Sequence, residues 1–303
     1  MRIALIVLIF ITLTAVIVVA TVNVIGLFEI EAKPTPTPTP ILTPTPTPTQ
    51  EPPSLGLTVH FIDVAQGDAI LLDLDETEVL IDGGDRSPGV TSYLENYVNG
   101  SLEVLIATHP HADHIGGLIE VLDDFDVEEI WLNGDTHTTN TYNDFMDKVN
   151  AEDADVKEAR RGDTIVVGNL VFDVLYPVEP LVDDINNNSV VLMLSYGDID
   201  FLFTGDAEEK FEFSMIVSSV FFDIDILKVG HHGSRSSSSQ IFLELIQPEV
   251  AIYMAGADNR YGHPHAETIS ALEDIGAEVY GTDINGDIVV TTDGETYDVG
   301  TEY

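Results

Sequence analysis

Apolar runs of strand length alternate with amphipathic runs of helical period from residue 55 onward. We predict helices at 115–125, 208–217, 238–246 and 266–275. The expected strands are 57–64, 69–74, 78–82, 104–108, 129–132, 164–167, 170–176, 189–196, 200–204, 224–229, 250–254 and 288–292. The tight turn Tyr196-Gly197-Asp198 requires an antiparallel pair, which a purely parallel sheet cannot contain. The pattern therefore predicts an α/β domain with mixed sheets and outer helices.

The first 54 residues follow a different pattern. Residues 3–28 carry no charge and are long enough to cross a hydrocarbon core of ~30 Å as a helix. We expect 1–29 to be a transmembrane anchor, with a cleaved signal peptide ending near Ala20 as the alternative. Residues 30–54 are a Pro/Thr-rich linker of extended polyproline type. We therefore expect 55–303 to be one domain outside the cell membrane, in a single-pass or a secreted protein.

Charge and composition limit the kinds of partner and of metal ligand that this chain can have. The chain has 11 Lys and Arg against 53 Asp and Glu, a net charge of −42. Such acidity is typical of proteins that stay hydrated in strong salt, where charges are screened within ~3 Å at 1 M. We expect a halophilic source and disfavour a nucleic-acid partner, since polyanion binding depends on basic residues. No cysteine is present, so any metal must be held by His, Asp, Glu or Asn.

Histidines supply the candidate chemistry. Seven of the nine fall in the clusters His109/His111/His114, His231/His232 and His263/His265. The first cluster follows the apolar run 104–108 and also contains Asp113. Two imidazoles at i and i+2 can converge on one ion, while Asp113 and His114 face another ion ~3.5–4 Å away. The spacing predicts a metal site rather than a surface loop.

The motif HPHADHIGG at 109–117 resembles the metallo-β-lactamase superfamily. Four more stretches resemble the hydrolase domain of ComEC-type competence proteins and the related phosphocholine esterases. They are FIDVAQGD (61–68), FTGD (203–206), KVGHHGS (228–234) and RYGHPH (260–265). The resemblance covers nearly all of 55–300. It implies an αββα sandwich of two mixed sheets with a two-metal site along one edge.

Roles of single residues follow from this resemblance. The implied metal ligands are His109, His111, Asp113, His114, Asp206 and His263. Asp206 would bridge the ions and His263 would complete the second site, although Asp206 alone also fits an ordinary helix N-cap. The implied catalytic residues are Asp113, His231 and His232, with His232 preferred for contact with the substrate. Asp82 would orient a ligand histidine. We expect structural roles for Asp63, Gln66 and Asp68, and structural or surface roles for His60 and His137.

One departure from the superfamily concerns the first metal. Many members supply a third histidine between the HxHxDH loop and the bridging aspartate, and only His137 occurs there. The corresponding segment contains Asn188, a candidate metal or substrate contact, as is Ser234. We expect two divalent ions, zinc first and manganese as the alternative, because oxygen-rich shells suit manganese. The alternative is that only one ion binds.

The residues favour an extracellular metal-dependent hydrolase that uses a metal-activated water. Its expected substrate is a phosphodiester, and Lys228, Arg235 and Arg260 would form a positive rim around the site. A small-molecule ester, phosphocholine-ester, lactam or lactone hydrolase is the second reading. A stalked binding module with a structural metal is the third. We do not expect a DNA-uptake channel, because competence proteins of this type carry many membrane spans, whereas this chain has at most one predicted span. No obligate protein partner is evident.

Overall fold

The computed structural model describes residues 56–218 and 223–303. The predicted anchor at 1–29 and the linker at 30–54 lie outside this part. Within it, no helix combines the length and the apolar character needed to cross a membrane.

Two mixed sheets form the centre of the described part, as the pattern of apolar runs predicted. The first has the order β15-β14-β1-β2-β3-β4-β5-β6. Its strands are β1 Leu57–Phe61, β2 Ile70–Leu74, β3 Thr77–Ile81, β4 Leu102–Ala107, β5 Val127–Leu132, β6 Asp155–Glu158, β14 Ile288–Thr292 and β15 Tyr297–Thr301. Strands β3 to β6 are parallel, and the remaining pairs are antiparallel.

The second sheet has the order β13-β12-β11-β10-β9-β8-β7. Its strands are β7 Thr164–Val167, β8 Leu170–Tyr176, β9 Val191–Tyr196, β10 Ile199–Phe203, β11 Ile226–Lys228, β12 Val250–Tyr253 and β13 Glu278–Gly281. The β9–β10 pair is antiparallel, as the turn at Gly197 requires, and β10 to β13 run parallel. Gly197 has φ +65°, a conformation that glycine adopts without strain.

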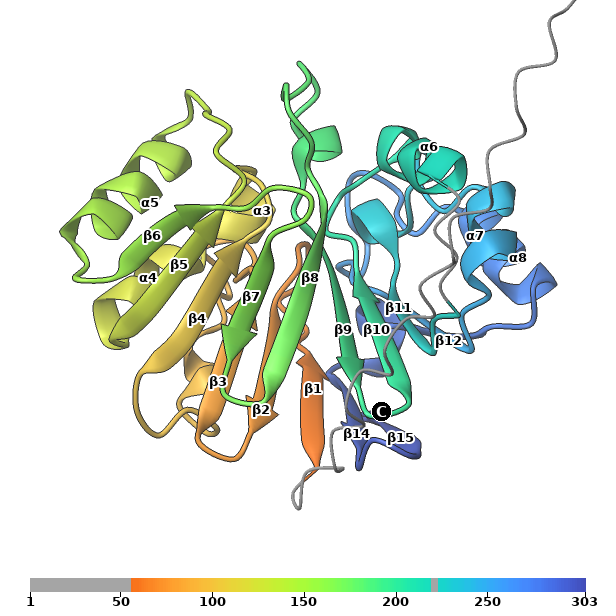
Figure 1. The fold of residues 1–303 in the computed structure, drawn as a ribbon, viewed down its shortest axis with the longest axis horizontal. Helices are drawn as coiled ribbons and strands as arrows, with labels where there is room; N and C mark the ends of the chain where they lie inside the picture. Colours follow the sequence, from red (N-terminus) through yellow and green to blue (C-terminus); the bar gives the residue numbers. More distant parts are fainter. Residues whose placement is uncertain (1–55, 219–222) are drawn as a thin grey trace, which may run out of the picture. The chain divides into compact units, whose positions relative to one another are not determined.

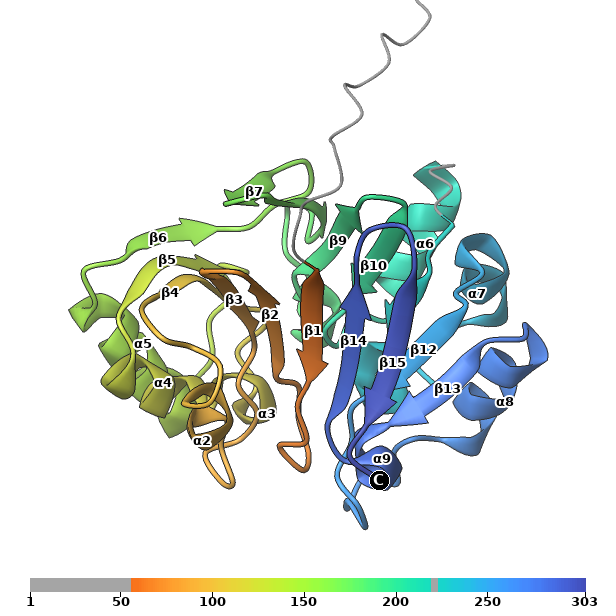
Figure 2. The ribbon, with the colours of Figure 1, turned by 90° about the horizontal axis from the view of Figure 1, so that it is seen from below.

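Helices cover the outer face of each sheet, which gives four layers (Figures 1 and 2). Those beside the first sheet are α2 Thr91–Leu94, α3 Ala112–Ile115, α4 Leu118–Asp124 and α5 Asn140–Ala151. Those beside the second are α6 Glu209–Ser218, α7 Gln240–Ile246 and α8 Ala266–Asp274. A short helix, α9 Thr282–Asn285, follows β13. One apolar core fills the space between the sheets, and another lies under each helical layer.

The structure differs from the predicted elements in two ways. The predicted helix at 115–125 is two helices, α3 and α4, separated by Gly116 and Gly117. A Cβ on Gly117 would lie 2.0 Å from the carbonyl oxygen of Gly83, so only glycine allows the two backbones to approach. Helices α2, α5 and α9 and strands β6, β13 and β15 were not predicted.

Candidate metal centre and active site

The candidate ligands come from loops at the ends of central strands. His109, His111 and His114 follow β4, and His114 lies in α3. Asp206 follows β10, and His232 lies in the tight turn Gly230–Gly233 after β11. Strand β10 runs parallel to β11, and β4 runs parallel to its neighbours β3 and β5, so these loops leave at the carboxyl ends of parallel strands. Ligands commonly bind at such ends.

One group of potential ligands is completely buried. It consists of Asp68, His114, Asp206 and His232, with one ligand atom of each within 4.8 Å of the others. Asp206 Oδ1 lies 3.3 Å from His114 Nε2 and 3.4 Å from His232 Nε2. Both imidazoles therefore point their Nε2 atoms at the same carboxylate oxygen.

A second group uses the other oxygen of Asp206. It consists of His109, His111 and Asp206, again with ligand atoms within 4.8 Å of one another. His109 Nε2 lies 3.7 Å from Asp206 Oδ2 and 3.0 Å from His111 Nδ1. Asp206 thus belongs to both groups, one carboxylate oxygen toward each.

Hydrogen bonds at Nδ1 fix the orientation of both imidazoles in the buried group. His114 Nδ1 lies 2.8 Å from Asp82 Oδ2, and Asp82 also accepts hydrogen bonds from the backbone and side chain of Thr108. His232 Nδ1 donates to the carbonyl oxygen of Met254 at 2.9 Å. Metal-binding histidines usually make such a hydrogen bond with the ring nitrogen that does not face the ion.

Electrostatics at the buried group favour positive charge. Burial lowers the pKa of His232, but the carboxylates of Asp206 and Asp68 outweigh it and raise the pKa to about 10. Burial likewise opposes a proton on His114, while Asp206 and Asp82 hold its pKa well above the usual range. The carboxylates therefore attract cationic charge into a site that excludes water.

The donor atoms also fit a metal ion. Asp68 Oδ1, His114 Nε2, Asp206 Oδ1 and His232 Nε2 are buried, with no hydrogen-bond partner among the residues that the structure describes. Unpaired buried polar atoms are costly, so four of them in one cluster indicate a missing partner. Imidazole and carboxylate donors are the set that zinc and manganese bind.

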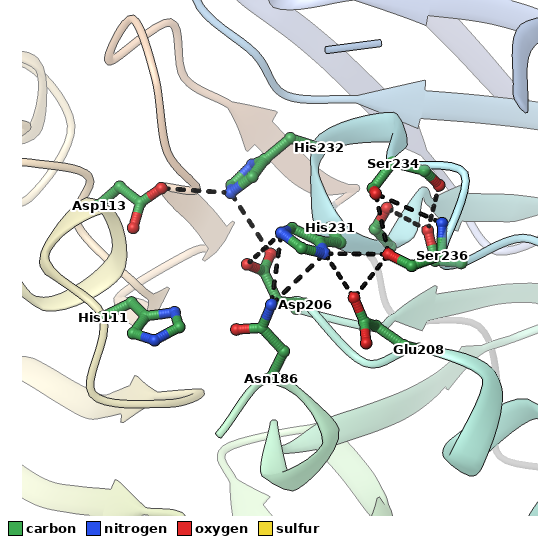
Figure 3. A network of polar contacts seen from close by, with 12 residues as sticks. His111, Asp113, Asn186, Asp206, Glu208, His231, His232, Ser234 and Ser236 are labelled. Carbon is green, nitrogen blue, oxygen red and sulfur yellow. Dashed lines mark hydrogen bonds and ion pairs between the residues drawn. The ribbon is translucent and has the colours of Figure 1, made fainter. Parts of the chain in front are cut away.

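His231 lines a cavity and lies between Asp206 and Glu208, with contacts to both (Figure 3). Its Nδ1 lies 2.8 Å from Glu208 Oε1, and its Nε2 lies 3.3 Å from Asn186 Nδ2 and 3.8 Å from Asp206 Oδ2. Glu208 also accepts hydrogen bonds from Ser236 at 2.5 Å and Asn187 at 3.0 Å. The carboxylate thus fixes the ring so that Nε2 faces the site.

A cavity of about 300 Å³ opens over these groups. Its lining includes residues of both ligand groups, His231 and several neighbours. These are Gln66, His111, Ala112, Asp113, His137, Thr139, Asn186, Asp206, His231, His232, Tyr261 and His263. The volume lies at the lower end of the range for ligand pockets, which suits a small substrate or a short part of a larger one.

Several predicted site residues lie outside the two ligand groups. Asp113 Oδ2 lies 3.5 Å from His232 Nε2 at the cavity wall. His263 lies in the same wall, its ring centroid 6.1 Å from that of His232. Asn188 is buried and bonds to Val182 and Asp135. Ser234 is buried too, and its Oγ lies 2.8 Å from that of Ser236.

The structure also brings in residues that sequence reasoning left aside. Asp68 belongs to the buried ligand group, Gln66 lines the cavity, and His137 packs edge-on against His111. His60 is buried, and its ring packs against Tyr93 and Tyr97. The repeated aspartates of the 61–68 motif, directly after a strand, were the available signal for Asp68.

The family model of the metallo-beta-lactamase superfamily matches residues 62–257, about two thirds of the chain. The chain belongs to the metallo-beta-lactamase superfamily. With its candidate ligand groups, it is a metal-dependent hydrolase of that superfamily, and the reading as a binding module with a structural metal is not supported.

Curated relatives of this superfamily member are competence proteins of the ComEC type. "ComE operon protein 3" of Bacillus subtilis (strain 168) is 32% identical over 76% of this chain and 32% of its own length. "Recombination protein 2" of Haemophilus influenzae is 29% identical over 77% of this chain and 28% of its own length. The chain thus spans about a third of the length of these curated relatives.

Among solved structures, the metallo-beta-lactamase fold protein YhfI from Bacillus subtilis is similar in fold. The TM-score is 0.53 at 14% identity, over 78% of this chain and 100% of that chain. This likeness supports the four-layer arrangement of the superfamily.

Proposed function

We propose that the chain hydrolyses phosphodiesters with a metal-activated water. The observation that carries the proposal is the pair formed by His231 and Glu208, which presents His231 Nε2 to the cavity 3.8 Å from Asp206. A phosphodiester needs a proton delivered to its leaving oxygen, and an imidazole beside the ligand groups can deliver one.

We propose that two divalent ions bind, zinc first and manganese as the alternative. Asp68, His114, Asp206 and His232 would hold one, and His109, His111 and Asp206 the other. When bound, such ions lower the pKa of water and polarise a phosphoryl oxygen.

The chain's own groups do the rest. Asp206 would bridge the two sites and keep their spacing. Glu208 accepts the Nδ1 proton of His231, so the ring holds or releases a proton only at Nε2. Asn186, in the same wall, has a side-chain amide oxygen, Oδ1, without a partner among the described residues, and this oxygen can accept a hydrogen bond from a substrate hydroxyl.

The name of the relative "Recombination protein 2" favours a phosphodiester, since recombination is a process of DNA. The charge of −42 disfavours long nucleic acid. The predicted positive rim is also smaller than expected, because Lys228 is completely buried while Arg235 and Arg260 are exposed. We therefore propose a short phosphodiester, with a small-molecule ester as the alternative that the cavity volume favours.

We further propose that the hydrolase works outside the cell membrane, anchored by residues 1–29 or released after their cleavage. The uncharged run at 3–28 supports this location.

The test is a substrate screen in high salt with zinc or manganese. Bis(p-nitrophenyl) phosphate, p-nitrophenyl acetate and a chromogenic lactam are compared, with Asp206→Ala as the metal-deficient control. Turnover of the phosphodiester well above the other two, lost in the control, supports the proposal. Preferred turnover of the acetate or lactam assigns the chain to the alternative, and phosphodiester turnover that persists in the control refutes the metal role.

A further inference from the structure

Lys228 is a buried cation next to the ligand groups. It ends β11, which lies between β10 and β12 in the second sheet, and its residue exposure is only 1%. A lone ammonium in such a place is strongly unfavourable unless an anion and hydrogen-bond acceptors surround it. The contacts of its Nζ therefore explain why a lysine can occupy this position.

The ammonium joins two segments that carry candidate ligands. Its Nζ forms an ion pair with Asp68 Oδ2 and donates to the carbonyl oxygen of Gly205 at 3.1 Å. Gly205 precedes Asp206, and Asp68 lies in the loop between β1 and β2. One side chain thus holds a loop of the first sheet against the end of a strand in the second.

Asp68 divides its two oxygens between different tasks. Oδ2 contacts Lys228, whereas Oδ1 has no hydrogen-bond partner among the described residues. Asp68 is also a member of the buried ligand group, and Oδ1 lies 3.3 Å from His232 Nδ1. The ion pair with Lys228 therefore leaves Oδ1 turned toward the imidazole of His232.

We propose that Lys228 is a positioning residue, an internal counter-ion that keeps Asp68 facing the ligand group when no divalent ion is bound. The ammonium balances the buried carboxylate before metal arrives, so the site is assembled in advance. This role concerns assembly of the metal site and does not depend on which ester is hydrolysed.

A physical consequence separates this role from ordinary packing. Without Lys228, the buried Asp68 would be balanced among the described residues by the imidazoles of His232 and His114, at 3.3 and 3.9 Å, with the carboxylate of Asp82 close by. The metal-free protein would then lose much of its stability. A divalent ion at the ligand group would then supply the missing positive charge. The loss should therefore be large without metal and smaller with it.

The experiment compares the full chain with Lys228→Met, which keeps an unbranched side chain of similar length without the ammonium. Melting temperature is measured after chelation and again with ZnCl₂ or MnCl₂, and bound metal is counted by elemental analysis. We expect the metal-free variant to melt about 6–20 °C lower. Added metal should raise its melting temperature by about 2–4 °C more than that of the parent. Lys148→Met, which breaks an exposed ion pair with Asp123, is the matched control and should change neither value.

A double variant guards against simple misfolding. In Asp68→Asn/Lys228→Met both charges are removed, so the metal-free protein should melt higher than Lys228→Met alone. It should also lose the extra metal response, since the negative charge of the carboxylate is gone. Two results would overturn the proposal. One is an equal metal response in the parent and in Lys228→Met. The other is a double variant whose loss of stability is as large as the sum of the losses in the two single variants.

Discussion

Adjacent residues have opposite surroundings in the His231-His232 pair. Both lie in the left-handed region, with φ of 46° and 53°, where a side chain other than glycine is strained. His232 turns into the buried ligand group, and His231 faces Glu208 and the cavity (Figure 3). The sequence favoured His232 for contact with the substrate, whereas the geometry favours His231. Strain of this kind is often retained where function requires it.

Two alanine variants should separate these roles. His231→Ala should lower phosphodiester turnover by ~10²–10⁴ with metal retained, the range for loss of a general acid or base. His232→Ala should lose metal, because the unpaired Nε2 of the buried group is removed. Turnover and metal content by elemental analysis are measured on the same samples.

His265→Ala is the control for these variants, since the ring accepts a hydrogen bond from the backbone of Arg235 and lies outside the cavity lining. Metal loss in His231→Ala would make that residue a ligand. Unchanged turnover in His231→Ala would show that solvent, rather than His231, delivers the proton to the leaving oxygen.

A buried carboxyl group that does not line the cavity, that of Glu78, predicts a pH dependence. Burial and the neighbouring carboxylates of Glu103 and Asp73 raise the pKa of Glu78 to about 7. The folded chain thus binds this proton more tightly than the unfolded chain, so stability falls as pH rises from about 4.5 toward 7. Glu78→Gln should melt about 2–4 °C above the parent at pH 8, with the difference vanishing below about pH 4.5. Melting curves across this pH range check it, with Glu95→Gln at an exposed position as control. A difference that is constant with pH would contradict the assignment.

At the scale of elements, strand register explains how the site is assembled. Phe203 of β10 pairs with Lys228 of β11, and Asp206 and His231 each lie three residues beyond these partners. The sequence predicted both strands and both loops. It could not predict that the strands are neighbours, because pairing order depends on long-range packing rather than on local pattern. For the same reason it did not reveal that Asp68 joins His232.

Helix α5 shows where apolar pattern alone was insufficient. Tyr142, Phe145, Met146 and Val149 have helical spacing, but polar residues surround them, and only Phe145 and Val149 are buried. Helices α4, α6, α7 and α8 were predicted because their apolar content is higher. The remaining signal lay in Thr139, whose side chain accepts a hydrogen bond from Tyr142 N.

This cap gives a prediction for stability. Thr139→Ala removes the hydrogen bond and should destabilise the fold by about 1 kcal/mol. The melting temperature should fall by about 2–4 °C. Thr139→Ser keeps the hydroxyl and should restore most of the loss. Because Thr139 also lines the cavity, melting is measured rather than activity. Equal melting of the alanine and serine variants would show that the cap contributes nothing.

The whole molecule carries a large excess of negative charge. With 53 acidic and 11 basic residues, surface carboxylates repel one another unless salt screens them. Exposed ion pairs such as Lys148 with Asp123 contribute little against this repulsion.

Stability should therefore depend on salt. Lowering the KCl concentration from ~2 M to ~0.05 M should reduce the melting temperature by several degrees, each kcal/mol being worth ~2–4 °C. Thermal melts at fixed pH check this, and sucrose in place of salt is the control for nonspecific stabilisation. A melting temperature that does not change with KCl would refute the halophilic adaptation while leaving the fold unaffected.

The buried ligand group draws on both sheets, with Asp68 and His114 from the first and Asp206 and His232 from the second. An ion held by all four would cross-link positions more than a hundred residues apart in a chain without cysteine. Like a disulfide, it would close a long loop whose entropy the unfolded chain otherwise keeps. Separation of the two sheets would require release of the ion, so unfolding becomes a dissociation reaction. Chelation should accordingly speed unfolding in denaturant, as measured by stopped-flow fluorescence of Trp131, and rates independent of chelator would show that the sheets separate without breaking the site.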